Sequence, residues 1–142
     1  MSGLYRHVLC AIDLDDKAVH VLRRAAALAG LASAELNIVH VVEYVPPLDM
    51  DYIVPPVEEV EAALLDAAHT RLEKLTAEAG IEHGRREVVS GRPGREIVRL
   101  AAEREVDLIV VGRHKRHGLV GVPGSTSERV VRDAPCDTLV VF

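Results

Sequence analysis

The sequence has few cysteines, no long apolar run and no excess of positive charge. Its two cysteines, Cys10 and Cys136, each lie inside an apolar segment, so we expect two small buried side chains in a reducing compartment rather than a disulfide framework or a zinc site. No apolar stretch approaches the roughly 20 residues that a membrane-spanning helix needs. The acidic residue Asp13 already follows the first short apolar run. These features predict a cytoplasmic protein that is not inserted in a membrane.

The formal net charge of −5 disfavours general nucleic-acid binding, which depends on many phosphate contacts from Lys and Arg. One basic cluster breaks this trend, because residues 113–117 read Arg-His-Lys-Arg-His without a carboxylate. We therefore expect no nucleic-acid partner, and we expect any bound anion to lie at this cluster. His114 and His117 have no further ligand in the loop that would complete a metal site.

Short runs rich in Val, Ile and Leu alternate with longer stretches of helical period, a pattern typical of a parallel sheet covered on both faces. The expected strands are residues 7–12, 35–41, 86–89, 108–111 and 138–142. We predict a single α/β domain over residues 1–142: a doubly wound, five-stranded parallel sheet sandwiched by four helices, Rossmann-like. We expect the proline-rich residues 44–56 to form a surface loop.

Helix boundaries follow from acidic caps, glycines and prolines. We expect the first helix to begin after a cap at Asp15 or Asp16 and to end at Gly30. Its predicted apolar face is Val19, Leu22, Ala26 and Ala29. The other helices are expected at residues 57–79, after the turn at 91–94, and at about 125–132.

Two segments are candidates for ligand binding, since ligands of open parallel sheets bind at the carboxyl ends of the strands. The first is the acidic end of strand one, Asp13, Asp15 and Asp16. A carboxylate there accepts hydrogen bonds from a ribose hydroxyl or an adenine amino group. The alternative is that these residues only cap the next helix. We favour capping for Asp15 and Asp16, and both interpretations stay open for Asp13.

The second candidate is the glycine-rich loop 112–126, which ends where a helix is expected to begin. Free backbone N–H groups and the positive end of a helix dipole favour an anion at such a place. Ser125 and Thr126 add hydroxyl donors, and Arg113 or Lys115 adds charge. The pattern indicates a phosphate-binding loop. The alternative is a surface loop in which Ser125 serves only as a helix cap.

In this loop the sequence resembles the universal stress protein family. That family closes its nucleotide site with a glycine, two residues, a second glycine, eight or nine residues, and a glycine followed by serine or threonine. Here Gly112 fits the first position, and Gly124 with Ser125 fits the last. The resemblance extends to residues 7–13, His40 with Val41, 91–93, 107–112 and 134–136, and so covers nearly the whole chain.

The resemblance implies an adenine nucleotide as ligand: ATP, or ADP or AMP, with magnesium held through the nucleotide near Asp13. The site that the resemblance implies consists of Ala11, Asp13, Val41, Val111, Gly112, Gly124, Ser125 and Thr126, and we add Arg113 and Lys115 to it for their charge. Lys115 departs from the pattern, because it stands where the family has its second glycine. Its side chain either crowds the phosphates or pairs with them.

The resemblance also implies a homodimer formed through the last strand, Thr138 to Phe142, whose edge no polar tail shields. The function it implies is a stress-response regulator with no catalytic residue and at most slow ATP hydrolysis, since the glycine loop carries no acidic residue. The alternative is a protein-interaction module that binds no nucleotide, contacts a regulatory partner and is phosphorylated at Ser125 or Thr126. A phosphoreceiver is disfavoured, because Ser90 and Gly91 stand where its acceptor aspartate would be.

Overall fold

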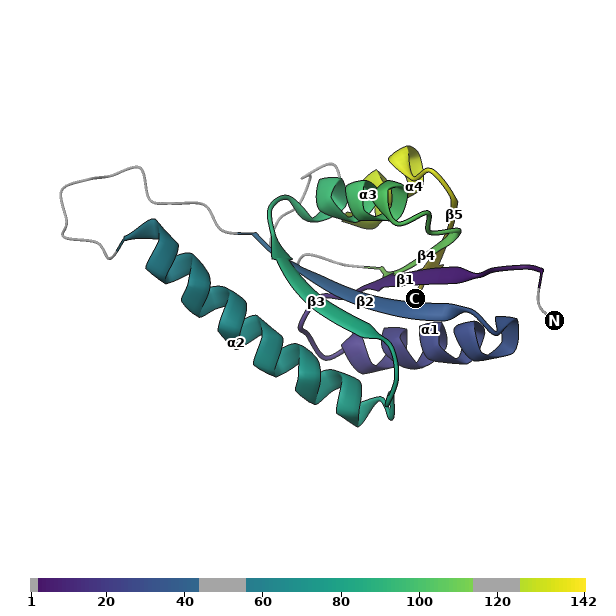
Figure 1. Ribbon diagram of the computed structural model, residues 1–142, viewed down its shortest axis with the longest axis horizontal. Coiled ribbons are helices and arrows are strands. Elements are labelled where there is room, and N and C mark those ends of the chain that lie inside the picture. Colours follow the sequence, from purple (N-terminus) through teal and green to yellow (C-terminus); the bar gives the residue numbers. More distant parts are fainter. Residues whose placement is uncertain (1–2, 44–55, 114–125) are drawn as a thin grey trace.

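A parallel sheet with helices on both faces forms the part of the chain that the structure describes (Figure 1). The structure is a computed structural model that describes residues 3–43, 56–113 and 126–142. In these ranges the elements are β1 His7–Ala11, α1 Ala18–Ala32, β2 Glu35–Val42, α2 Val57–Glu78, β3 Arg85–Ser90, α3 Pro93–Glu103, β4 Leu108–Gly112, α4 Thr126–Asp133 and β5 Asp137–Val141. The predicted fold is confirmed, and every predicted strand lies within one residue of its observed bounds.

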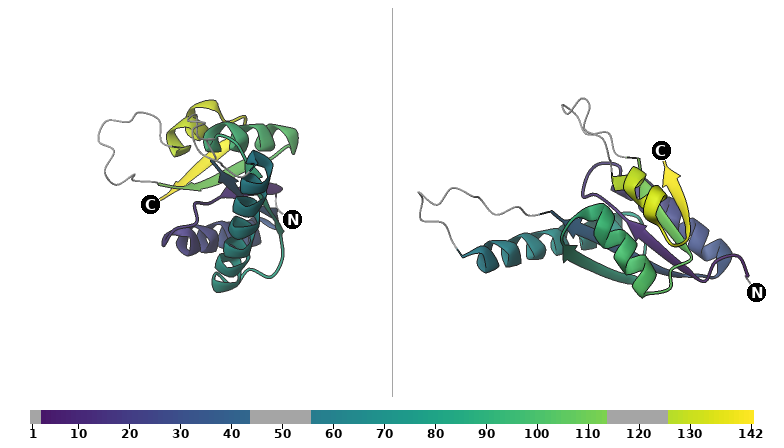
Figure 2. Two further views of the ribbon diagram at one scale, coloured as in Figure 1. Left: turned by 90° about the vertical axis from the view of Figure 1, so that its left-hand side faces the viewer. Right: turned by 90° about the horizontal axis from the view of Figure 1, so that it is seen from above.

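The strand order is β3-β2-β1-β4-β5, with all neighbouring strands parallel. The chain therefore builds the sheet outward from β1 to β3, crosses back over it, and continues from β4 to β5. Figure 2 shows α1 and α2 on one face of the sheet and α3 and α4 on the other. The reversal lies between β1 and β4, so connections leave their carboxyl ends in opposite directions and open a crevice there.

Alternate side chains of the central strands enter two separate cores. On β1, Val8 and Cys10 pack with α1 and α2, whereas Leu9 and Ala11 pack with α3 and α4. Burial raises the pKa of the Cys10 thiol to about 12, which makes it an unreactive small apolar group. Cys136 is only half-buried, so the prediction of two buried cysteines is right for one of them.

Helix α1 differs from its predicted bounds at both ends. The carboxylate of Asp15 accepts the Lys17 N–H at 3.0 Å, so it caps a turn before the helix, and the N-cap position belongs to Lys17. The helix also continues through Gly30 to Ala32, because Ser33 adopts the left-handed conformation (φ 54°) that ends it. An isolated glycine costs a helix only about 1 kcal/mol, which packing of the next turn offsets.

The buried face of α1 is also rotated from the predicted one. Its buried residues are Ala18, Val21, Leu22, Ala25, Ala29 and Ala32. Val19 and Ala26, which we expected to be buried, lie at the margin of this face. The helix turns its smallest side chains toward the sheet, so the backbone approaches the strands closely.

A carboxylate fastens β1 to β4 at the amino ends of these strands. Asp107 accepts the backbone N–H groups of Arg6 and His7 at 2.8 and 2.9 Å. Desolvation raises the pKa of this carboxyl group, but hydrogen bonds from backbone N–H groups, those of Arg6 and His7 first, outweigh it and hold the pKa below its usual range. Asp107 therefore stabilises the fold in its ionised form.

We expect Asp107→Asn to lower the free energy of unfolding by about 1 kcal/mol at pH 7, because an amide cannot accept both N–H groups. A lowered folded-state pKa means that the contribution is complete above the unfolded pKa, about 3.9. It is lost as the pH falls through the folded pKa. Urea unfolding at a series of pH values measures this. Asp66→Asn on the exposed face of α2 is the control, and an equal loss from Asp107→Asn at every pH would contradict the assignment.

Candidate functional site

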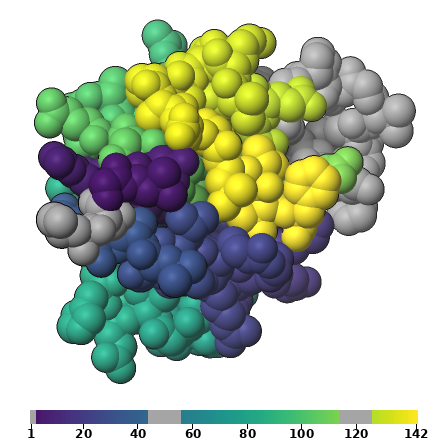
Figure 3. Space-filling view, turned by 90° about the vertical axis from the view of Figure 1, so that its right-hand side faces the viewer, coloured from purple at the N-terminus to yellow at the C-terminus, as the bar shows by residue number. Residues whose placement is uncertain are grey.

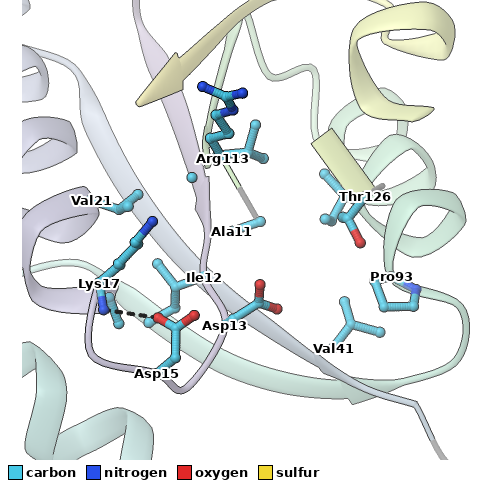
Figure 4. Close-up of a pocket in the computed structure, with 14 residues that line it drawn as sticks. Ala11, Ile12, Asp13, Asp15, Lys17, Val21, Val41, Pro93, Arg113 and Thr126 are labelled. Carbon is cyan, nitrogen blue, oxygen red and sulfur yellow. Dashed lines mark hydrogen bonds between the residues drawn. The ribbon is translucent and has the colours of Figure 1, made fainter. Parts of the chain in front are cut away.

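A pocket opens at the carboxyl ends of β1 and β4, where the chain order reverses (Figure 4). Strand ends, the start of α1 and the first residues of α3 and α4 all contribute to its walls. Its lining residues are Ala11, Ile12, Asp13, Asp15, Lys17, Ala18, Val21, Val41, Pro93, Ile97, Val111, Gly112, Arg113 and Thr126.

The floor of the pocket is apolar. Ala11, Val41 and Val111 lie at or one residue before the ends of three neighbouring strands and belong to the core that α3 and α4 cover. Each is less than a tenth exposed, and Ala11 has no atom beyond Cβ to fill the space above it. A flat apolar surface of this kind suits one face of an aromatic base.

Polar groups stand above this floor. Asp13 follows β1 and is exposed, and Thr126 is the first residue of α4. Figure 4 shows the Asp13 carboxylate and the Thr126 hydroxyl facing the open space between them. A carboxylate acceptor and a hydroxyl donor thus lie on opposite sides of an apolar floor, an arrangement that orients a ligand with polar edges.

Two consecutive residues of β2, His40 and Val41, point to opposite faces of the sheet. Val41 faces the pocket, while His40 faces the opposite side of the sheet, because side chains alternate along a strand. The Nδ1–H of His40 donates to the carbonyl oxygen of Ile12 at 2.7 Å. This bond holds the chain as it leaves β1, just before Asp13.

The far wall is formed where β4 meets α1. A Cβ atom on Gly112 would lie 2.9 Å from Cγ2 of Val21, so only glycine permits this approach without a shift. The next residue, Arg113, donates its backbone N–H to the carbonyl oxygen of Val141 at 2.8 Å. Its guanidinium lies over the Phe142 ring, 4.7 Å from the centroid. The end of β4 is therefore fixed against both α1 and β5.

Most of the predicted site residues line this one pocket. The structure brings together Ala11, Asp13, Val41, Val111, Gly112, Arg113 and Thr126. Lys115, Gly124 and Ser125, together with His114 and His117, lie outside the described residues. Asp15 lines the pocket although we favoured capping for it, whereas Asp16 does not line it.

Lys17 is a pocket residue that the sequence analysis missed. No motif marks it, because it lies one position before α1 in a segment that we interpreted only as a helix start. The observed bounds of α1 bring it to the pocket.

Metal binding by side chains alone has little support in the described part of the chain. Residues 3–43, 56–113 and 126–142 contain no group of three His, Cys, Asp or Glu side chains that would hold an ion. Asp13 and Asp15 supply carboxylate oxygens, which Mg²⁺ prefers, and Mg²⁺ is often bound by one or two carboxylates plus substrate phosphates. Within the same ranges, none of the helices is long and apolar enough to cross a membrane.

Comparison with known proteins identifies the class. The model of the universal stress protein family matches residues 4–141, and the chain belongs to this family. It is 33% identical over 139 residues to universal stress protein A homolog 1 of Coxiella burnetii, covering 97% of this chain and 96% of that one.

Solved structures of the family have the same fold. The chain superposes with a TM-score of 0.68 and 28% identity on a universal stress protein in complex with cAMP, over 99% of this chain and 98% of that one. It superposes with a TM-score of 0.73 and 26% identity on protein MJ0577 of Methanocaldococcus jannaschii, over 97% of this chain and 96% of that one.

We expect Gly112→Ala to lower the free energy of unfolding by about 1 kcal/mol, because the added methyl group must displace Val21. In a Val21→Ala background the same substitution should cost less, since the obstructing Cγ2 is gone. Urea unfolding of the four proteins forms a double-mutant cycle. Equal costs of Gly112→Ala in both backgrounds would show that this contact does not constrain the wall.

Proposed function

We propose that this protein is a stress-response regulator that binds an adenine nucleotide, ATP or alternatively ADP or AMP, in the pocket between β1 and β4. It acts as a single domain over residues 1–142 in the cytoplasm. It works through conformation or assembly rather than through robust catalysis. The observation that carries this proposal is the pocket itself: an apolar floor and an acidic rim, at the reversal point where parallel sheets bind nucleotides.

The adenosine part of the ligand contacts the strand ends. Ala11, Val41 and Val111 offer apolar surface to the base, and Asp13 accepts hydrogen bonds from a ribose hydroxyl or the adenine amino group. The universal stress protein solved with cAMP supports this choice of ligand, since it is a family member of the same fold with an adenine nucleotide bound.

The phosphates extend toward the end of β4 and the start of α4. Gly112, Arg113 and Thr126 line that side of the pocket. Gly124 and Ser125 complete the loop implied by the family motif, and Lys115 adds a positive charge where that motif has a glycine. A magnesium ion accompanies the phosphates near Asp13. Hydrolysis is at most slow, because residues 112–126 contain no acidic side chain to act as a base or metal ligand at the phosphates.

We further propose that the protein is a homodimer paired through β5. This strand lies at the edge of the sheet and pairs only with β4 among the described strands. Figure 3 shows it at the surface, between α1 and α4. Phe142, which follows it, is 77% exposed. An open edge with apolar side chains favours pairing with a second copy.

We expect Asp13→Ala to weaken ATP binding about tenfold or more, the effect of losing hydrogen bonds to a charged acceptor. Asp16→Ala is the matched control, because Asp16 is an exposed aspartate three residues away that does not line the pocket. Isothermal titration calorimetry of nucleotide-stripped protein with ATP and magnesium measures both. Equal affinities of the two variants would remove Asp13 from the site.

A Lys115→Gly variant in the same titration separates the nucleotide-binding function from the alternative, an interaction module regulated at Ser125 or Thr126. Saturable binding by the native protein supports the regulator, with Lys115 tolerated or contributing. Binding by the glycine variant alone would mean that Lys115 closes the site, and would favour a protein partner.

We expect Val140→Pro to convert the dimer to a monomer. The Val141 carbonyl accepts from Arg113, so the Val141 backbone faces β4 and the Val140 N–H faces the open edge, where proline is tolerated. Light scattering after size exclusion measures the mass, and circular dichroism checks the fold. Val140→Thr keeps the N–H and should remain dimeric. A folded Val140→Pro dimer would place the interface elsewhere.

A further inference from the structure

Two cations flank one wall of the pocket. Lys17 lies four positions before Val21, so the two side chains share one face at the start of α1. Val21 is the residue that Gly112 approaches, and Arg113 follows Gly112 directly. Both Lys17 and Arg113 line the pocket. The centre of the wall is therefore the apolar contact between Val21 and Gly112. The positive charge of Lys17 lies on one side of this contact and that of Arg113 on the other.

Both cations have a fixed backbone. The Lys17 N–H donates to Asp15 at 3.0 Å, and the Arg113 N–H donates to Val141 at 2.8 Å. The Arg113 guanidinium also lies over the Phe142 ring, with its Cζ atom 4.7 Å from the centroid. Stacking uses the face of the guanidinium and leaves the N–H donors at its edge available.

These charges are not neutralised within the described part of the protein. In residues 3–43, 56–113 and 126–142, neither the Lys17 ammonium nor the Arg113 guanidinium has a carboxylate at ion-pair distance. The helix arginines Arg99 and Arg129, in contrast, are paired with carboxylates four residues along at 2.6 and 3.0 Å. An anion on this wall would pair with both cations.

The charged tips of this wall point away from the carboxylates of the pocket, although the Asp15 carboxylate accepts the backbone N–H of Lys17 (Figure 4). In Figure 4, Asp13 and Asp15 are at the lower end, and the charged tips of Lys17 and Arg113 lie above them. A ligand that spans the pocket thus meets hydrogen-bond acceptors at one end and cations at the other. That polarity matches a nucleotide, whose hydroxyl groups and amino group donate and whose phosphates are negative.

We propose that Lys17 and Arg113, the latter oriented by Phe142, form an anion subsite that selects adenine nucleotides with a chain of two or more phosphates. The inference rests on the proposed function and specifies its ligand. A chain of phosphates carries enough charge and length to contact both cations, whereas the phosphate of a cyclic nucleotide is tied back to the ribose. The protein therefore binds ATP and ADP more tightly than cAMP or adenosine.

Calorimetry with ATP, cAMP, adenosine and inorganic tripolyphosphate tests this subsite. We expect Lys17→Gln and Arg113→Gln each to weaken binding of ATP and tripolyphosphate about tenfold, the size of one charge-assisted hydrogen bond, and to leave adenosine affinity unchanged. Lys74→Gln is the matched control, because it removes the same charge from an exposed position on α2. It should behave like the native protein.

Substitutions of Phe142 test whether its ring positions the Arg113 guanidinium. Phe142→Leu should weaken ATP binding several-fold while adenosine affinity stays the same, and Phe142→Tyr should restore ATP binding because it keeps an aromatic face. The salt dependence of ATP binding should decrease in Lys17→Gln and Arg113→Gln but not in Lys74→Gln.

Failure of this inference and failure of the proposed function give different results. Native protein that binds adenosine and ATP equally, or a Lys17→Gln variant with native ATP affinity, would overturn the subsite and leave adenine binding intact. Tripolyphosphate binding that requires Lys17, in a protein that binds no adenosine, would support the subsite and refute the adenine site.

Discussion

The reversal of chain order between β1 and β4 is the constraint on which the rest of the structure depends. Because these two strands are parallel neighbours in the middle of the sheet, their carboxyl ends meet at one point while the following segments diverge. That divergence opens the pocket at the edge of the sheet. It also gathers residues 11–17 and 111–113, which are about a hundred positions apart in the sequence.

The floor of the pocket is apolar, whereas its rim is charged. Its floor belongs to the core, so Ala11, Val41 and Val111 must be apolar for the fold as well as for a ligand. Its rim carries charged side chains, because Asp13, Lys17 and Arg113 lie beyond the strands and outside both cores. Substitutions at the floor therefore change stability and binding together, whereas those at the rim separate the two.

The sequence predicted the sheet well because its strands are continuous apolar runs, a pattern that depends on burial on both faces. Asp13 and Gly112 could be placed at the pocket for the same reason, since each directly follows or ends such a run. Helix α1 was harder, because its many alanines give no clear apolar face and Gly30 resembles a helix end. Lys17 was missed as a result. Its place in the pocket depends on where α1 starts, and the local hydrogen bonds there, such as the one from the Lys17 N–H to Asp15, could not be read from a motif.

The contrast between global and local charge explains how an acidic protein offers a site for an anion. The net charge of −5 acts over distances that salt screens, because the Debye length is only about 8 Å at physiological ionic strength. In the subsite that we propose, a bound phosphate lies much closer than this to Lys17 and Arg113. Many of the acidic residues, by contrast, are spread over exposed helix surfaces, and some, such as Glu96 and Glu103, are paired with arginine there. The proposed subsite therefore depends on the positions of individual side chains rather than on the net charge of the protein.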